Sequence, residues 1–587
     1  MKQLLLVFAV LLSCGCASVA DEPRAVMEPE TLAEIIQDYD AFVRSYDPDE
    51  AARHEDRAPD SWPNVSAAAL KARAAEARAF QARIMVADTT GDEISTLILY
   101  NVLDEMIERG EPTNYVIPFT GDWGFQSVPS FSISRARIET VEEANALIAR
   151  IDDIPNYYAA NIANMREGLA MGFTAYKDPL NTTIDQVRQQ IVSINTASDL
   201  YTPFKTLPES MAEIEQFQIR RDAELAIGNA ITASSELLQF FETEYAPHAR
   251  AEPGIGTLDG GKAYYRRQLA LHTTRPDLTP EQVHQTGLSE VARIRAEMEV
   301  IIEESGFAGS FAEFIAFLRT DPQFYAETPE ALLSYAATLS KRLDAALPRY
   351  FGTLPRLTYG VLPVPAAIAP GYTTGRYAQG DPDQGRAGTY YVNTYRLDQR
   401  PLYQLAALTA HEAVPGHHLQ IALAQEMSGQ PRYRREYYAT AFGEGWGLYA
   451  ERLAGEAGLY ETPYERFGAL SYEMWRACRL VSDTGLHWYG WSREEAEACF
   501  TQNTALAPHN IETEVTRYIG WPGQATAYKI GELTISGLRA EAEDALGETF
   551  DIRAFHDTVL EEGSVPLAVL EERVRDWIRA EIDASAQ

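Results

Sequence analysis

The chain carries the stretch H-E-A-V-P-G-H-H from His411 to His418, followed by F-G-E-G-W-G-L-Y-A-E-R-L from Phe442. Three of its ten histidines fall in the first stretch. A hydrolytic zinc site needs imidazole and carboxylate ligands, an open position for water, and a further carboxylate that accepts the proton of that water. The three histidines, the adjacent Glu412 and the acidic residues of the second stretch supply these groups. The sequence therefore predicts a metal site.

The histidine spacing differs from that of the common H-E-x-x-H motif, in which positions i and i+4 share one helix face. On a regular helix His417 would be rotated by about 120° from His411, and His418 would be in phase but about 10.5 Å further along the axis. Pro415 lacks an N–H and Gly416 tolerates unusual dihedral angles, so we expect a deformed helix here. If the helix absorbs two extra residues, His417 becomes the second ligand, and His418 is the alternative.

Composition excludes some classes of partner. The chain has 587 residues, of which 46% are hydrophobic and 23% charged, and its net charge is −35 with a pI near 4.7. This charge repels phosphate backbones and anionic membrane surfaces, so we expect no nucleic-acid partner. We divide the chain into a leader (1–16), a polar segment (17–62) and one large helical domain (63–587).

The N-terminus predicts export. Its sequence, M-K-Q-L-L-L-V-F-A-V-L-L-S-C-G-C, has one lysine and an apolar run too short for a permanent membrane span, as in a secretory signal. The L-L-S-C ending resembles a bacterial lipoprotein box, with Cys14 as the lipidated residue and Cys16 as the alternative. We therefore expect a periplasmic protein that contacts a membrane only through this anchor.

Two cysteines, Cys478 and Cys499, lie outside the leader. Gly485 and Gly490 between them would let two helices fold back and form a disulfide in an oxidising compartment. We nevertheless favour two buried free thiols, because free cysteine behaves as a small hydrophobic residue.

Apolar residues at helical spacing predict a mainly α-helical protein. Residues 63–350 form the scaffold, 351–540 the catalytic core and 541–587 the C-terminal helices. The predicted amphipathic helices span Ala67–Met85, Ile138–Ile151, Asn156–Met171, Ile184–Ile194 and Met211–Phe240. Capping residues predict helix starts at Thr279, Ser310 and Thr328.

The run A-G-T-Y-Y-V-N-T-Y-R-L from Ala387 is the clearest strand, and it precedes the histidine-bearing segment. An exposed edge of this strand would hold an extended peptide near the metal. The alternative is a small structural β-hairpin that covers the core.

Four motifs carry a family resemblance: H-E-A-V-P-G-H-H-L-Q, E-G-W-G-L-Y-A-E, R-L-V-S-D-T-G-L-H and P-G-Q-A-T-A-Y-K-I-G, in that order. With G-K-A-Y-Y-R-R-Q-L-A-L-H-T-T from Gly261 and L-P-R-L-T-Y-G-V from Leu354, they resemble the bacterial family called domain of unknown function 885 (DUF885). The resemblance covers nearly the whole chain after the leader.

That family is distantly similar to the helical zinc peptidases of the carboxypeptidase Taq and thimet oligopeptidase kind. The similarity implies a two-lobed helical body around a deep cleft. It also implies that Glu444 is the third zinc ligand, that Glu451 orients a histidine or braces its helix, and that Tyr528 steadies the oxyanion.

These observations predict a zinc-dependent peptidase that acts on short or unstructured peptides. His411, His417 and Glu444 would hold one Zn²⁺, and Glu412 would be the general base for a metal-activated water. His487, with its tautomer fixed by Asp483, is a second candidate oxyanion donor beside Tyr528.

Three further interpretations stay open from the sequence. Arg517 could bind a substrate carboxylate, although an ordinary salt bridge is favoured. The protein could be a lipid-anchored binding protein for peptides or small ligands whose metal is not catalytic. It could also be a zinc amidase or esterase that acts on a non-peptide acyl group.

Overall fold

The structure is a computed structural model that describes residues 30–585, except 122, 367–368, 370–371 and 383–384. It is mainly α-helical, as predicted. The leader with Cys14 and Cys16 lies outside the described residues. The helices of the first part of the chain are α1 (Leu32–Tyr46), α2 (Pro48–His54), α3 (Ala67–Ile84), α4 (Glu93–Arg109), α5 (Pro112–Tyr115), α6 (Val128–Ile133), α7 (Val141–Asp152), α8 (Ile154–Met171), α9 (Lys177–Gln190), α10 (Glu213–Phe240), α11 (Gly261–Thr273), α12 (Pro280–Glu304), α13 (Phe311–Thr320) and α14 (Pro329–Ala346).

The second part of the chain carries the motifs on closely packed helices. These helices are α15 (Leu402–Glu412), α16 (His417–Gln425), α17 (Arg432–Glu436), α18 (Thr440–Glu456), α19 (Pro463–Thr484), α20 (Arg493–Asn503), α21 (Pro508–Gly520), α22 (Ala527–Leu546), α23 (Ile552–Leu560) and α24 (Leu567–Ser585). Among the described residues, no helix is both long enough and apolar enough to cross a bilayer.

The predicted helix boundaries agree with the structure where capping residues mark them. Thr279 and Ser310 form capping boxes at the starts of α12 and α13, and the side chain of Thr328 caps α14. The helix predicted over Ile184–Ile194 is displaced, because α9 starts at Lys177 and ends at Gln190.

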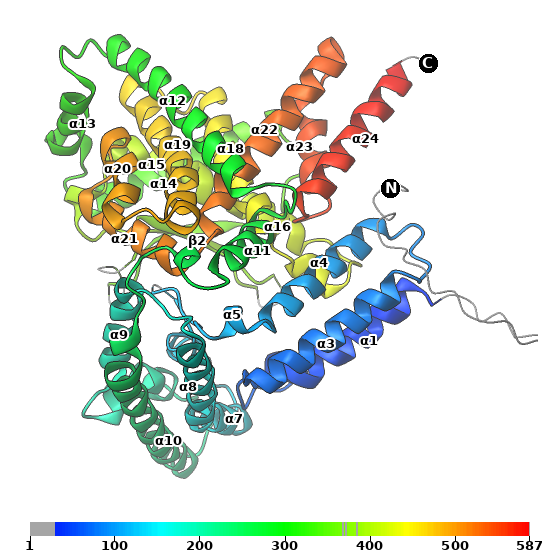
Figure 1. Cartoon of the computed structure of the whole chain (residues 1–587), viewed down its shortest axis with the longest axis vertical. Coiled ribbons are helices and arrows are strands. Elements are labelled where there is room, and N and C mark those ends of the chain that lie inside the picture. Colours follow the sequence, from blue (N-terminus) through cyan, green and yellow to red (C-terminus); the bar gives the residue numbers. More distant parts are fainter. Residues whose placement is uncertain (1–29, 122, 367–368, 370–371, 383–384, 586–587) are drawn as a thin grey trace, which may run out of the picture.

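Two large hydrophobic cores and one smaller cluster organise the described part of the molecule. One core lies among helices α7–α10 and the segments that join them. The other joins α1, α3 and α4 to the C-terminal half of the chain. In Figure 1, helices α8–α10 and the pair α1 and α3 project on the side opposite the C-terminal bundle. The predicted cleft between two lobes stays a prediction.

Part of the segment that we set apart before residue 63 is helical, because α1 and α2 lie within it. Leu32, Ile35 and Tyr39 of α1 are buried in the same core as the C-terminal helices. Apolar residues at helical spacing thus pack α1 against the helical body.

A small sheet precedes the histidine-bearing segment. Its strands are β1 (Tyr359–Pro363), β2 (Gly375–Ala378) and β3 (Gly388–Val392), in the order β1-β3-β2. β3 is the predicted strand; it pairs in antiparallel register with β2, as in a hairpin, and in parallel register with β1. Because β3 is central, it has no free edge for a peptide, and that interpretation of this strand is wrong.

The structure also corrects our assignment of two free thiols. Cys478 on α19 and Cys499 on α20 form a disulfide, with their Cα atoms 5.7 Å apart. The two helices pack against each other, which brings the cysteines within bonding reach.

Candidate metal centre

The helix that carries the H-E-A-V-P-G-H-H stretch is broken at the predicted position. α15 ends at Glu412, α16 begins at His417, and the four residues between them are not helical. The N–H of Gly416 donates to the carbonyl of Ala410 (2.9 Å), and the indole of Trp446 donates to the carbonyl of Pro415 (2.7 Å). A Cβ on Gly416 would lie 1.9 Å from the carbonyl oxygen of His411, so only glycine fits here.

The break brings His411 and His417 together with Glu444 of α18. Oε2 of Glu444 lies 3.5 Å from Nε2 of His411 and 3.5 Å from Nε2 of His417. The two imidazole rings are nearly perpendicular, at 88°, and their centroids are 4.7 Å apart. One ligand atom from each of the three residues falls within 4.8 Å of the others.

These distances fit a zinc ion. Two ligand atoms that each lie about 2.0–2.1 Å from Zn²⁺ at tetrahedral angles are about 3.3–3.5 Å apart. A separation of 3.5 Å is long for a direct hydrogen bond between a ring nitrogen and a carboxylate. The donor set of two imidazoles and one carboxylate is also that of a catalytic zinc site, which keeps its fourth position open.

Glu451 lies two turns along α18 from Glu444, on the same helix face, and it orients His411. Nδ1–H of His411 donates to Oε1 of Glu451 (2.8 Å), which leaves Nε2 facing Glu444 and His417. Arg476 of α19 in turn lies 3.1 Å from Glu451. Burial alone would lower the pKa of His411, but its contacts with Glu444 and Glu451 outweigh burial and raise it to about 9.

The Glu444 carboxylate is held in its charged form. Burial opposes ionisation, but the adjacent His411 and His417 outweigh it and hold the pKa of Glu444 well below its usual range. A carboxylate that stays ionised in a buried position is suited to coordinate a cation.

Glu412 is adjacent in sequence to His411 and is held by the sheet. The backbone N–H of Tyr377 in β2 donates to Oε2 of Glu412 (2.7 Å). This hydrogen bond fixes one carboxylate oxygen, and the other has no hydrogen bond within the described part of the chain. A carboxylate fixed in this way can accept a proton through its second oxygen.

His418 faces away from the centre. Its Nδ1 accepts from the hydroxyl of Tyr377 (3.0 Å), and its Nε2–H donates to the carbonyl of Leu357 (3.1 Å). Burial lowers the pKa of His418 to about 4, so the ring is neutral. Both ring nitrogens are therefore engaged, and it is His417, not His418, whose Nε2 faces Glu444.

Glycines around Glu444 allow close helix packing. A Cβ on Gly445 would lie 2.4 Å from the backbone of Gly531, so α18 and α22 approach each other at this point. A Cβ on Gly447 would lie 2.5 Å from Cε1 of His411. The G-E-G-W-G pattern thus places the helix that carries Glu444 directly against His411 and against α22.

We expect Gly447→Ala to weaken metal binding by about 10- to 100-fold, because the added methyl group displaces the His411 ring. This is the loss of affinity expected when a ligand histidine loses the partner that orients it. The measurement is metal affinity by calorimetry. Gly537→Ala on α22 is the matched control, since a Cβ there meets nothing within 4 Å. An unchanged affinity in Gly447→Ala would show that the ring has room to move.

Two tyrosines lie close to the carboxylates of the centre. Burial, and then the charge of Glu444, raise the pKa of Tyr528 at the start of α22. Burial and the charges of Glu444, Tyr528 and Glu412 raise the pKa of Tyr438 well above its usual value, although the residue as a whole is 39% exposed. Neither phenol has a hydrogen-bond partner among the described residues. Tyr438 escaped the sequence analysis because nothing distinguishes it from the other tyrosines, 31 in all.

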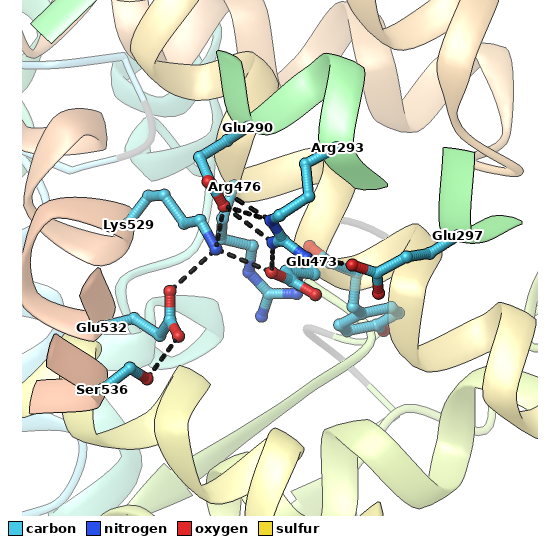
Figure 2. Close-up of polar contacts among 9 residues, drawn as sticks. Glu290, Arg293, Glu297, Glu473, Arg476, Lys529, Glu532 and Ser536 are labelled. Carbon is cyan, nitrogen blue, oxygen red and sulfur yellow. Dashed lines mark hydrogen bonds and ion pairs between the residues drawn. The ribbon is translucent and has the colours of Figure 1, made fainter. Parts of the chain in front are cut away.

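A buried charge network fixes the helix that carries Tyr528. The next residue, Lys529, has a side chain that is 0% exposed and contacts Glu473 of α19 (2.7 Å), Glu532 of α22 (2.7 Å) and Glu290 of α12 (3.1 Å). Figure 2 shows these carboxylates around the ammonium group, with Arg293 bridging Glu290 and Glu473. The network ties three helices together beside the metal centre.

His487 does not reach the centre. Its Nδ1 accepts from the N–H of Ile255 (3.1 Å), and its Nε2–H donates to the carbonyl of Tyr518 (3.0 Å). The expected partner, Asp483, instead accepts from the hydroxyl of Tyr265 (2.7 Å). Because backbone groups engage both ring nitrogens, His487 has no free N–H for an oxyanion, and we no longer assign it a catalytic role.

The buried Asp483 predicts a pH-dependent stability. Burial raises its pKa to about 7, from 3.8, so the carboxyl stays protonated in the folded protein at pH values where it ionises in the unfolded chain. The Asp483 carboxyl therefore makes its full contribution to the free energy of unfolding below about pH 4. This contribution is lost as the pH rises through 7. We expect Asp483→Asn to remove this loss, which amounts to at most about 4 kcal/mol.

Urea denaturation of the wild type and of Asp483→Asn at pH 4, 5.5, 7 and 8 measures this effect. The stability of the wild type relative to the variant should fall between pH 4 and pH 7. A difference that does not change with pH would contradict the raised pKa.

Comparisons with known proteins place the chain in a family. The model of the family described as "Bacterial protein of unknown function (DUF885)" matches residues 48–574. A crystal structure described as that of "the putative lipoprotein from Colwellia psychrerythraea" superposes with a TM-score of 0.85 at 28% identity, over 93% of this chain and 98% of that one. Another, from Shewanella oneidensis, described as "a putative lipoprotein of unknown function", has the same fold, with a TM-score of 0.70 at 19% identity over 92% of this chain and 98% of that one.

No curated protein matches the sequence. The family match extends over most of the chain and includes both stretches that form the metal centre. The chain therefore belongs to the bacterial DUF885 family.

Proposed function

We propose that the protein is a zinc-dependent peptidase that hydrolyses short or unstructured peptides. The observation that carries the proposal is the convergence of His411, His417 and Glu444 at zinc-ligand spacing, with the Glu412 carboxylate fixed next to them. His411, His417 and Glu444 would hold the ion. A zinc ion supplies two things when bound: it polarises a carbonyl group and it acidifies a water molecule.

The residues around the ligands would complete the reaction. Glu412 accepts the proton of the attacking water through its free oxygen and returns it to the leaving amine, while Tyr377 N–H holds the other oxygen in place. Tyr528 and Tyr438 each have a phenol O–H without a partner in the described structure, and the charge of Glu444 contributes to the raised pKa of both. A donor in that position stabilises the negative charge that develops on the carbonyl oxygen.

We further propose that the protein is exported and anchored in the periplasm through a lipid on Cys14 or Cys16. The support is the lipoprotein-like leader and the similarity to a Colwellia protein described as a putative lipoprotein. Radiolabelled palmitate should label the wild type and not Cys14→Ala, or not Cys16→Ala if that residue is the site.

The experiment that tests the proposed activity is incubation of the zinc-loaded protein with a mixed peptide library, read by mass spectrometry. We expect cleavage products in the presence of zinc and none after chelation. Peptides retained without cleavage would favour the binding-protein alternative. Hydrolysis restricted to non-peptide amides or esters would favour the amidase or esterase alternative.

A further inference from the structure

A second polar cluster lies beside Tyr528, on the side of α19 and α21. Arg479 of α19 stacks on the Tyr528 ring, with its guanidinium carbon 4.2 Å from the ring centroid. Its Nη2 donates to Oε2 of Glu514 on α21 (3.0 Å), and its Nε donates to the hydroxyl of Tyr518 (3.0 Å). Nη1 of Arg479 is buried without a hydrogen-bond acceptor among the residues that the structure describes.

Arg517 of α21 brings a second guanidinium to the same cluster. Its Nη1 donates to Oε1 of Gln524 (2.6 Å), and its Nη2 lies 3.5 Å from Glu514, which is the salt bridge favoured from the sequence. A guanidinium has five N–H donors, so several donors of Arg517 have no acceptor among the described residues. The Arg517 side chain is 14% exposed, whereas that of Arg479 is 5% exposed, so Arg517 is the more accessible of the two.

The cluster has more positive than negative charge. Two guanidinium groups share one carboxylate, Glu514, whose pKa they lower to about 2 against the opposing effect of burial. Asp483 is the next carboxyl group whose pKa is affected by the charge of Arg517, and burial raises the pKa of Asp483 to about 7. An excess positive charge in a largely desolvated site is costly unless an anion neutralises it. The excess is notable in a chain whose net charge is −35.

A buried histidine borders this cluster. Nε2 of His272 on α11 is buried without a partner in the described part of the chain, and its ring packs against Trp521 at a centroid distance of 5.8 Å. Burial, and then the charge of Arg517, lower the pKa of His272 to about 4. His272 is therefore neutral, and its ring can donate one hydrogen bond next to Arg517.

We infer that Arg517, supported by Arg479 and His272, binds a carboxylate of the substrate next to the metal centre. Tyr528 connects the two sites: its ring stacks on Arg479, and it lies on α22, which packs closely against the Glu444-bearing helix α18 at Gly445 and Gly531. A guanidinium with free donors recognises a carboxylate by paired hydrogen bonds. The inference rests on the proposed function for the substrate class, a peptide, whose carboxylate is either the C-terminal group or an acidic side chain.

Peptide binding to the zinc-loaded Glu412→Gln protein, measured by calorimetry, tests this inference without turnover. The probes are three forms of one alanine–leucine pentapeptide: a free C-terminal carboxylate, a C-terminal amide, and the amide with glutamate at the last position. We expect the carboxylate form to bind roughly 10- to 100-fold more tightly than the plain amide. Tight binding of the glutamate form alone would identify an acidic side chain as the ligand instead.

The preference should disappear in Arg517→Gln and shrink in Arg517→Lys, which keeps the charge but loses the planar fork. Arg573→Gln on α24 is the matched control, because that side chain is 17% exposed and also pairs with glutamates. Thermal melts establish that each variant is folded. If Arg517→Gln does not fold, Arg517→Lys alone tests the preference.

The outcomes separate the inference from the proposed function. Equal affinities for the carboxylate and amide forms, including no measurable binding of either, would overturn the inference. A retained carboxylate preference together with no cleavage by the wild type would overturn the peptidase proposal and leave the carboxylate site standing.

Discussion

Glu412→Gln should lower peptide hydrolysis by about 10²- to 10⁴-fold, the range that a general base contributes, while the protein still binds one zinc ion. Glutamine keeps the shape of the side chain, and its carbonyl oxygen can still accept the hydrogen bond from Tyr377 N–H. It cannot accept a proton from water. The proposed metal ligands are separate residues, so the affinity for zinc should change little.

The measurements are the rate of cleavage of a peptide found in the library experiment, and zinc content by mass spectrometry. Glu465→Gln is the matched control, because Glu465 has the same 9% exposure as Glu412 but caps α19 away from the centre. We expect that control to keep its activity. A Glu412→Gln protein that cleaves at the wild-type rate would refute the assigned base, and loss of zinc would show that Glu412 is itself a ligand.

Local chemistry in the sequence predicted much of the fold. Thr279, Ser310 and Thr328 carry their own capping hydrogen bonds, so the starts of α12, α13 and α14 could be placed without tertiary information. The break before His417 was likewise predictable, because Pro415 and Gly416 act on the backbone locally.

The features that depend on distant partners were not predictable from local sequence. The strand from Gly388 was recognised, but its central place depends on β1, which pairs with it across 24 intervening residues. Cys478 and Cys499 were assigned as free thiols because the packing of α19 on α20 decides their distance. His487 has the same residue type as the ligands, and only the backbone groups of Ile255 and Tyr518 show that it is structural.

The second large expected effect is a difference in zinc binding between variants of the two adjacent histidines, His417 and His418. His417→Ala should weaken zinc binding by more than the roughly 10- to 100-fold that loss of an outer partner costs, because it removes a direct ligand. His418→Ala removes hydrogen bonds to Tyr377 and Leu357 instead, so it should lower stability by about 1–3 kcal/mol and retain the ion.

Zinc stoichiometry and thermal melts with and without a chelator distinguish these effects in the same pair of proteins. Each variant is the control for the other, since both substitutions remove one buried imidazole from the first turn of α16. Retention of zinc by His417→Ala together with its loss from His418→Ala would mean that α16 turns by one residue when the metal binds. That result would assign the ligand role to His418 and leave Glu444 and His411 as the fixed part of the site, because Gly447 and Glu451 hold these two residues together independently of α16.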